Sequence, residues 1–354
     1  MAATNLPPGR ALHALLIGGS GFLGGHAARG LLAAGHHVSV LSRGRSTPVP
    51  GTVALTADRR DAGSMGAALG GLRFDLSVDF GLFDAPDLEW LGQVSPTALG
   101  RFVMISTGQV YLVGAGAAMP YREEDDRFPL MSEPPAGSAD HAPWSYGAGK
   151  RRAEATLARV AESGLDAVTL RLPTVQGEGD TSLRLWAYLE RMLDGGPLVL
   201  PDGARRPARF VYAGDLAGAL ASIAAAPRLA HRAYNLSQPD VMPLRDFIDR
   251  VAHAAGLAPR LIEASWEECR TAAIDERFLP YAGSWASVLD PARIAEELGV
   301  VCARCEDYLP RVVRWHLEHR PAASHEGYAD RSRERDLAAR LLGTGQAPGH
   351  VPRH

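Results

Sequence analysis

The chain is poor in lysine and in cysteine. Of its 37 basic residues, only Lys150 is a lysine. Three cysteines cannot form a disulfide framework. Cys302 and Cys305 make one Cys-x-x-Cys pair, whose alternative interpretation is a redox or zinc site, but a structural zinc site needs a second such pair. We therefore expect reduced thiols and no metal.

Long apolar runs and a large net charge are also missing. The apolar runs are too short and too often interrupted by glycine to span a bilayer, and the N-terminus has no signal pattern. A net charge of -3 gives no reason to expect nucleic acid or an anionic membrane as a partner. These limits predict a cytoplasmic protein that acts on a small molecule.

Short apolar runs alternate with helical patterns along the first half of the chain. Strands that are apolar throughout are typical of a parallel sheet covered by helices on both faces. The pattern therefore predicts an α/β fold with a doubly wound parallel Rossmann sheet. The predicted strands are residues 12–17, 38–42, 52–56, 74–80, 101–107 and 166–172.

The second half is less regular and indicates a smaller region interleaved with the first. We expect a dinucleotide-binding Rossmann domain over residues 11–173, to which 209–236 contribute. A C-terminal α/β region, predicted to bind substrate, covers 174–208 and 237–320. Residues 321–354 form a polar, arginine-rich tail.

A glycine-rich turn, GGSGFLG, separates the first predicted strand from the first helix. Gly18, Gly21 and Gly24 permit a tight turn in which backbone N–H groups approach a pyrophosphate at the positive end of the helix. Phe22 and Leu23 begin that helix. All five residues are therefore predicted to bind the cofactor.

The end of the second predicted strand indicates which dinucleotide binds. A carboxylate there would bind the adenosine ribose, but the chain has Ser42 and then Arg43, a phosphate partner, which favours NADP over NAD. Asp58, after the third strand, would contact the adenine edge, and Arg59 beside it is expected to line the same site. The alternative for Asp58 is an N-terminal acid of the helix at 61–69.

The single lysine follows a tyrosine at helical spacing. Tyr146 and Lys150, four residues apart, share one face of a helix. The ammonium can then stabilise a tyrosinate and make Tyr146 a general acid or base. A chance coincidence is the alternative interpretation of this pair.

Six motifs in order resemble the extended short-chain dehydrogenase/reductases, the group often called NAD-dependent epimerase/dehydratases. The match covers roughly residues 12–320. The motifs are Gly18-x-x-Gly21-x-x-Gly24, Ser106-Thr107-Gly108-Gln109-Val110-Tyr111, Tyr146-x-x-x-Lys150, Arg171-Leu172-Pro173, Asp215-Leu216-Ala217 and Tyr234-Asn235-Leu236.

The resemblance implies a role for each matching residue. Thr107 would hydrogen-bond the substrate oxygen that becomes carbonyl or alcohol, and Tyr146 would transfer the proton. Lys150 would hold the nicotinamide ribose and support the tyrosinate. The segments implied to lie along the cofactor are Phe80, Gly81, and Pro173 through Val175.

Two departures from the family concern the substrate. The 4,6-dehydratases carry two acids where this chain has Gly108 and Gln109, and Gln109 cannot take a proton at neutral pH. Sugar-nucleotide epimerases place an arginine where this chain has Ala208, with Arg206 and Arg209 on either side. Gln109, Arg206 and Arg209 are therefore the candidate substrate residues.

These observations lead to three functional hypotheses. We expect an NAD(P)-dependent oxidoreductase that moves hydride to or from a secondary alcohol or ketone on a sugar, nucleoside or similar polar metabolite. The alternative is a net non-redox epimerase or dehydratase that forms a transient keto intermediate and retains its cofactor. A non-catalytic dinucleotide-binding module is disfavoured, because it has no use for Thr107, Tyr146 and Lys150.

Two further features keep alternatives open. The segment 112–143, rich in proline, glycine and acid, is either a lid or binding loop or a solvated insertion. Helices predicted near 85–98 and 145–162 are candidates for a homodimer face.

Overall fold

The structure is a computed structural model, which describes residues 10–276 and 278–344. The chain divides into two compact units. Within the described part, the first unit comprises residues 10–177, 209–240 and 287–305, and the second comprises 178–208, 241–286 and 306–344. Residues 287–305 thus pack with the first unit, whereas the sequence pattern grouped them with the substrate-binding region.

A seven-stranded parallel sheet forms the centre of the first unit, which confirms the predicted Rossmann-like architecture. Its strand order is β11-β6-β5-β4-β1-β2-β3, and every neighbouring pair is parallel. The strands are β1 (His13–Ile17), β2 (His37–Ser42), β3 (Val53–Thr56), β4 (Leu76–Asp79), β5 (Arg101–Thr107), β6 (Ala167–Leu172) and β11 (Ala233–Asn235).

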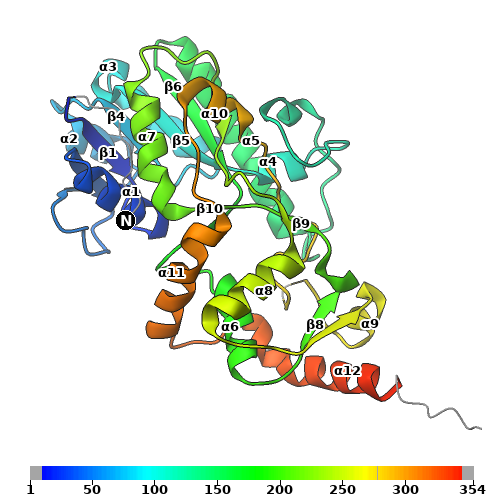
Figure 1. Ribbon diagram of the computed structural model, residues 1–354. Coiled ribbons are helices and arrows are strands. Elements are labelled where there is room, and N and C mark those ends of the chain that lie inside the picture. Colours follow the sequence, from blue (N-terminus) through cyan, green and yellow to red (C-terminus); the bar gives the residue numbers. More distant parts are fainter. Residues whose placement is uncertain (1–9, 277, 345–354) are drawn as a thin grey trace, which may run out of the picture. The chain divides into compact units, whose positions relative to one another are not determined.

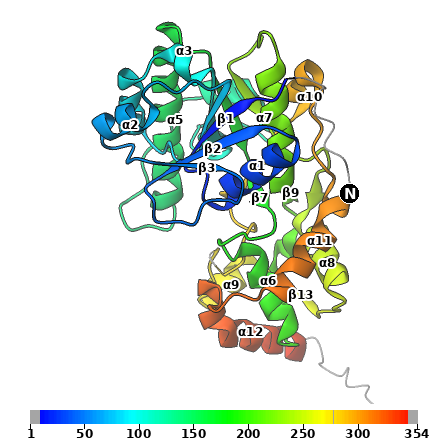
Figure 2. The ribbon, with the colours of Figure 1, turned by 90° about the vertical axis from the view of Figure 1, so that its left-hand side faces the viewer.

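Helices cover both faces of this sheet, as Figure 2 shows for α1 and α7 on one side and α2 and α5 on the other. Each face has its own buried apolar cluster, which supplies the main stabilisation of the unit. One face is covered by α1 (Phe22–Ala33), α7 (Leu216–Ala225) and α10 (Ala292–Leu298), and the other by α2 (Ala62–Leu69), the 3₁₀ helix η1 (Ala85–Gln93) and α5 (His141–Glu162).

The helix predicted over 85–98 is wrong as a single element. The structure has η1 up to Gln93, an extended Val94, and then a short helix α3 (Pro96–Leu99). Proline at position 96 lacks a backbone donor and disfavours helical geometry at Ser95. The other predicted long helix is present as α5, four residues longer at its N-terminal end than predicted.

Short elements complete the first unit. β7 pairs in parallel with β10, and α4 follows β5 directly. These elements are α4 (Gln109–Leu112), η2 (Glu123–Arg127), β7 (Thr174–Gln176), β10 (Phe210–Tyr212) and η4 (Ala213–Asp215).

The second unit is a small α/β assembly, labelled in Figure 1 around β8. β8 pairs in parallel with β13, and β9 pairs antiparallel with β12. Its elements are α6 (Arg184–Leu193), β8 (Leu198–Pro201), η3 (Asp202–Ala204), β9 (Pro207–Ala208), β12 (Met242–Pro243), α8 (Leu244–Ala255), β13 (Leu261–Ala264), α9 (Trp266–Thr271), α11 (Cys305–Glu318), η5 (Glu326–Asp330) and α12 (Arg331–Thr344).

The described part of the predicted polar tail is anchored by buried charge. Glu334 on α12 is fully buried and accepts a hydrogen bond of 2.8 Å from the backbone N–H of Val199. Arg331 pairs with both Glu334 and Asp194. Across residues 10–276 and 278–344, no helix combines the length and apolar character needed to cross a membrane.

Candidate active site

The candidate cofactor site lies at the carboxyl ends of the central strands. β1 has β2 on one side and β4 on the other, so the chain order reverses at β1. In open α/β sheets, ligands bind at this kind of switch point, just beyond the strand ends. Many of the residues predicted for the cofactor lie at or just after the ends of β1, β2, β3 and β4, and the fold therefore brings these to one edge.

The glycine loop after β1 has the geometry that the sequence predicted. Gly18 has a φ of 78°, in the left-handed region that favours glycine. A Cβ on Gly24 would lie 2.3 Å from the Cα of Gly19, so helix and loop approach more closely than a side chain allows. Because the N-cap of α1 is Gly21, no side chain caps its first turn, and those N–H groups remain available to a phosphate.

The two apolar residues of the loop have different surroundings. Leu23 packs against the apolar core under α1. The ring of Phe22 makes an edge-to-face contact with His26 at 5.3 Å between centroids. A contact of either side chain with the cofactor stays a prediction.

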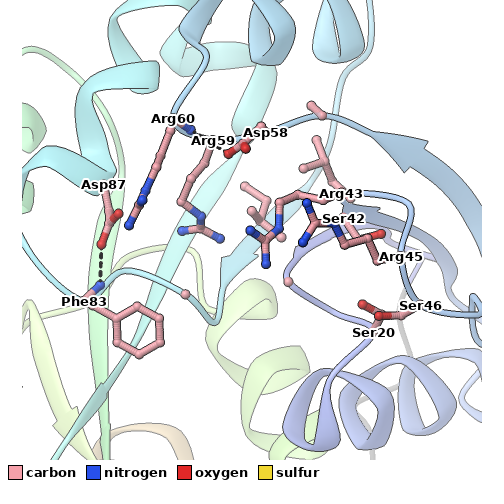
Figure 3. A pocket seen from close by; sticks show the side chains of 15 residues that line it. Ser20, Ser42, Arg43, Arg45, Ser46, Asp58, Arg59, Arg60, Phe83 and Asp87 are labelled. Atoms are coloured by element: carbon pink, nitrogen blue, oxygen red, sulfur yellow. Dashed lines mark hydrogen bonds between the residues drawn. The ribbon is translucent and has the colours of Figure 1, made fainter.

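A pocket of about 360 Å³ opens beside this loop and is strongly basic. Arginine side chains enter it from two loops, and only two aspartates line it. Figure 3 shows Arg43, Arg45 and Arg59 pointing toward the same part of the pocket, with Arg60 beside them. A cluster of guanidinium groups is suited to bind a phosphate group, because each can donate two parallel hydrogen bonds.

Ser42 and Asp58 line the same pocket. The Ser42 hydroxyl oxygen accepts a hydrogen bond of 3.2 Å from the backbone N–H of Gly44. The N-cap of α2 is Asp61, so Asp58 does not cap that helix. The exposed Asp58 carboxylate accepts a bond of 3.1 Å from the N–H of Arg60, and its predicted adenine contact stays a prediction.

Sequence reasoning missed a buried carboxylate at this edge. Asp79, the last residue of β4, has no exposed surface. Both of its oxygens accept hydrogen bonds from Nη1 of Arg59, at 2.8 and 3.0 Å. The signal was an aspartate at the end of a strand predicted to be buried, which points to a specific partner because an unpaired buried charge is very costly.

The predicted acid/base pair lies on α5, with the lysine buried and the tyrosine accessible. Lys150 is 2% exposed, and its Nζ donates a hydrogen bond of 3.0 Å to the carbonyl oxygen of Ile105. Tyr146 is 38% exposed, with its ring centroid 5.9 Å from that nitrogen. The Phe83 ring lies on the same ammonium at 5.1 Å. Burial lowers the pKa of Lys150 to about 8, so the group is charged at neutral pH.

Thr107 ends β5 at the same edge of the sheet. Its hydroxyl oxygen accepts a hydrogen bond of 3.3 Å from the backbone N–H of Gln109, at the start of α4. α5 packs closely on this segment, because a Cβ on Gly147 would lie 2.7 Å from the carbonyl oxygen of Gln109. That close approach holds the N-terminal part of α5, which carries Tyr146, against α4.

A buried polar network joins several of the sequence motifs beneath this site. Arg171 on β6 is 2% exposed and donates to Glu154 on α5 and to the hydroxyl of Tyr111. Ser106 donates to the same Glu154 carboxylate. The hydroxyl of Tyr111 in turn donates to Asn235, at 2.7 Å. The network therefore fixes α5 against β5 and β6.

The segment 112–143 is fastened to the first unit through its acidic run. Glu123 is 5% exposed and accepts a hydrogen bond of 2.8 Å from the backbone N–H of Asn235. Asp126 pairs with Arg171. At least these two acids therefore serve the structure of the unit.

The remaining predicted residues are placed as follows. Phe80 and Gly81 follow β4 beside Gly18, since a Cβ built on Gly18 lies 3.6 Å from the Phe80 Cβ and 4.0 Å from the Gly81 nitrogen. Pro173 is buried between β6 and β7, and Val175 pairs with β10. The predicted contacts of these four residues with the cofactor stay predictions.

The two candidate substrate arginines both bind backbone carbonyls within their own units. Arg209, in the first unit, donates to Leu289 at 2.5 Å and Pro239 at 2.9 Å. Arg206, in the second, donates to Ser284 at 2.9 Å. Their predicted role toward substrate therefore stays a prediction.

The three cysteines are buried and free. Burial and the nearby Asp215 raise the pKa of Cys302 well above its usual value, which disfavours a reactive thiolate. In residues 10–276 and 278–344, no group of histidine, cysteine and acidic side chains is arranged to hold a metal.

Known proteins resemble this chain along most of its length. Residues 88–237 match the family described as NAD dependent epimerase/dehydratase. The 2'-dehydrokanamycin reductase of Streptomyces kanamyceticus is 27% identical over 96% of this chain and 94% of that protein. The 2-alkyl-3-oxoalkanoate reductase of Stenotrophomonas maltophilia (strain K279a) is 28% identical over 75% and 83%.

Solved structures share the fold. The UDP-glucose 4-epimerase of Thermotoga maritima has a TM-score of 0.67 at 18% identity, over 87% of this chain and 99% of that one. The dTDP-glucose 4,6-dehydratase of Streptomyces venezuelae has a TM-score of 0.64 at 22% identity, over 87% and 98%, and was solved with NAD bound. The family model and the two reductases confirm the predicted resemblance and enzyme class, of the NAD-dependent dehydrogenase/reductase and epimerase/dehydratase type, and the solved structures confirm the fold.

Proposed function

We propose that the protein is an NADPH-dependent reductase of a ketone. The observation that carries the proposal is the basic pocket at the end of β2. It contains four arginines and, where a carboxylate would bind an unphosphorylated ribose, Ser42. A 2'-phosphate placed there would meet Arg43 and Arg45. NADPH is the form of nicotinamide dinucleotide that such a pocket favours.

The curated relatives support the direction of the reaction. Both are named reductases, and both names describe a ketone: a dehydro-aminoglycoside in one and a 3-oxoalkanoate in the other. These two compounds differ greatly in polarity, so together they represent both polar and apolar ketone substrates. We propose that this chain reduces a ketone of one of these kinds.

The side chains on α5 and β5 can perform the proton half of such a reduction. Bound NADPH would supply the hydride. The Tyr146 hydroxyl would donate its proton to the carbonyl oxygen, and the Thr107 hydroxyl would hydrogen-bond the same oxygen. The Lys150 ammonium, 5.9 Å from the tyrosine ring, would stabilise the tyrosinate that remains.

The test is oxidation of NADPH, followed by its absorbance, with 2'-dehydrokanamycin and with a 2-alkyl-3-oxoalkanoate. We expect turnover with at least one ketone, a preference for NADPH over NADH, and loss of turnover in Tyr146→Phe. Purified protein that retains stoichiometric NAD, and converts a sugar nucleotide with none added, would instead establish the non-redox alternative.

A further inference from the structure

The feature that the proposed chemistry leaves unused is the buried carboxylate of Asp79. β4 lies between β1 and β5, where Asp79 is in register with Ile17 and Met104. Ile17 and Met104 belong to the apolar cluster beneath α5. A fully buried carboxylate in such surroundings requires compensating charge and hydrogen bonds.

Arg59 provides that compensation from the loop after β3. Nη1 of Arg59 bonds both oxygens of Asp79, and the backbone N–H of Gly81 adds a bond of 2.8 Å. Within the described residues, Arg59 makes these hydrogen bonds through Nη1 alone, so Nε and Nη2 remain as donors. The Arg59 side chain is 17% exposed, so its guanidinium is held rather than freely solvated.

The rest of the Arg59 guanidinium lies against the glycine loop. Its Nη2 would be 2.7 Å from a Cβ on Gly81 and 3.9 Å from a Cβ on Gly18. Gly18 begins the turn that would receive a pyrophosphate, and Figure 3 shows Arg59 entering the pocket there. The guanidinium edge that Asp79 leaves unused is therefore placed to contact a diphosphate.

The other neighbour of Asp79 is the catalytic ammonium. Lys150 reaches in from α5 and bonds the carbonyl of Ile105, the residue after the register partner of Asp79. The strand that carries Asp79 pairs with the strand that carries Ile105, so the carboxylate lies within electrostatic reach of the ammonium. The charges that act on Lys150 are Asp79 from β4, Glu154 from α5 and Asp87 from η1, which favour its cation, and Arg59, which opposes it.

We propose that Asp79 is a positioning residue shared by two cations: it holds Arg59 against the glycine loop to bind the cofactor diphosphate, and it is a buried counter-charge for Lys150. This inference rests on the proposed dinucleotide chemistry. The role proposed for Arg59 differs from that of Arg43 in the dinucleotides that it serves. A diphosphate contact serves NADPH and NADH alike, whereas a 2'-phosphate contact serves NADPH alone.

The test is Asp79→Asn, which keeps the shape of the side chain and an acceptor for Gly81 but removes the charge. We expect the Kd values for NADPH and NADH, measured by calorimetric titration, to rise together by about tenfold. In the background of Arg59→Gln, the same substitution should add little, because the cation that it positions is gone. Equal effects in both backgrounds would contradict the positioning of Arg59.

The pH dependence of kcat/KM gives a second, independent readout. Loss of the Asp79 charge should move the alkaline limb to lower pH, since that carboxylate favours the Lys150 cation. Arg59→Gln should move it to higher pH, since the guanidinium opposes the cation. A purely structural role for the ion pair predicts no such opposite displacements.

The matched control is Asp75→Asn, just before the other end of β4. Asp75 also accepts a backbone hydrogen bond, of 2.9 Å from His13, and pairs with Arg10. The Asp75→Asn substitution should leave both Kd values and the alkaline limb of kcat/KM unchanged. If Asp79→Asn does not fold, Arg59→Gln alone must still weaken the binding of both dinucleotides and move the alkaline limb of kcat/KM to higher pH.

The outcomes separate this inference from the proposed function. Wild-type protein that binds neither NADPH nor NADH would refute both. Wild-type protein that binds them, with a folded Asp79→Asn variant that has the same Kd values and the same pH limb, would refute the role of Asp79 alone.

Discussion

Replacing Lys150 with methionine is expected to stabilise the protein while it destroys turnover. Lys150 is 2% exposed, and burial lowers the pKa of its ammonium from 10.5 to about 8. A pKa difference of this size corresponds to about 3 kcal/mol of destabilisation at neutral pH. Losing the hydrogen bond to Ile105 costs about 1 kcal/mol. The expected net gain in the free energy of unfolding is therefore about 2 kcal/mol.

The pH dependence of this gain has a definite sign. The folded protein holds the Lys150 proton less tightly than the unfolded chain does, so the destabilisation is complete below pH 8 and is lost as the pH rises towards 10.5. The stability advantage of the methionine variant should accordingly shrink across this window.

Urea unfolding followed by circular dichroism, at neutral pH and at about pH 10, measures both effects. Lys150→Arg serves as the control, because it keeps a charge and should not stabilise the protein, although its larger planar head should impair turnover. A methionine variant that is less stable than wild type at neutral pH, or that keeps full turnover, would refute this account of Lys150.

Three further substitutions test other parts of the site. Tyr146→Phe should lower turnover by about 10²–10⁴-fold and leave the Kd for NADPH unchanged, and normal turnover would exclude Tyr146 as the proton donor. Arg43→Ala should raise the Kd for NADPH by about tenfold and leave the Kd for NADH unchanged. Arg29→Ala on α1, outside the pocket, should change neither Kd, and an equal effect of Arg43→Ala on both dinucleotides would argue against a 2'-phosphate site. Glu154→Gln should lower the free energy of unfolding by about 3 kcal/mol, because it breaks a buried ion pair. Glu162→Gln, at the end of the same helix, should lower it by less than about 0.5 kcal/mol, and similar losses in both variants would show that the buried network contributes little.

The elements that the sequence predicts well are those with a local signal. The strands of the Rossmann sheet are short apolar runs, and the glycine turn carries its spacing in seven consecutive residues. The helix over 85–98 failed for a local reason too, because a proline at 96 interrupts an otherwise helical pattern.

The buried polar pairs could not be predicted in the same way. Arg59 and Asp79 are separated by 20 positions and meet only because the parallel sheet brings the loop after β3 and the end of β4 to the same edge. Arg171 and Glu154 meet because α5 packs beside β6 in one particular register. The chain contains 36 other arginine and lysine residues that either acid might have paired with, so composition alone cannot select the partner.

Comparison of two buried cations explains why an arginine-rich chain has a lysine at position 150. Arg171 is buried where carboxylates, a tyrosine hydroxyl and the Glu123 carbonyl accept hydrogen bonds from its Nε, Nη1 and Nη2. In the described part of the chain, Lys150 reaches one hydrogen-bond acceptor, the carbonyl of Ile105, and the rings of Phe83 and Tyr146 flank it. A guanidinium there would bury several donors without partners, whereas an ammonium fits and leaves its charge beside the tyrosine. The lysine is therefore selected by the small number of acceptors at the site as well as by its chemistry.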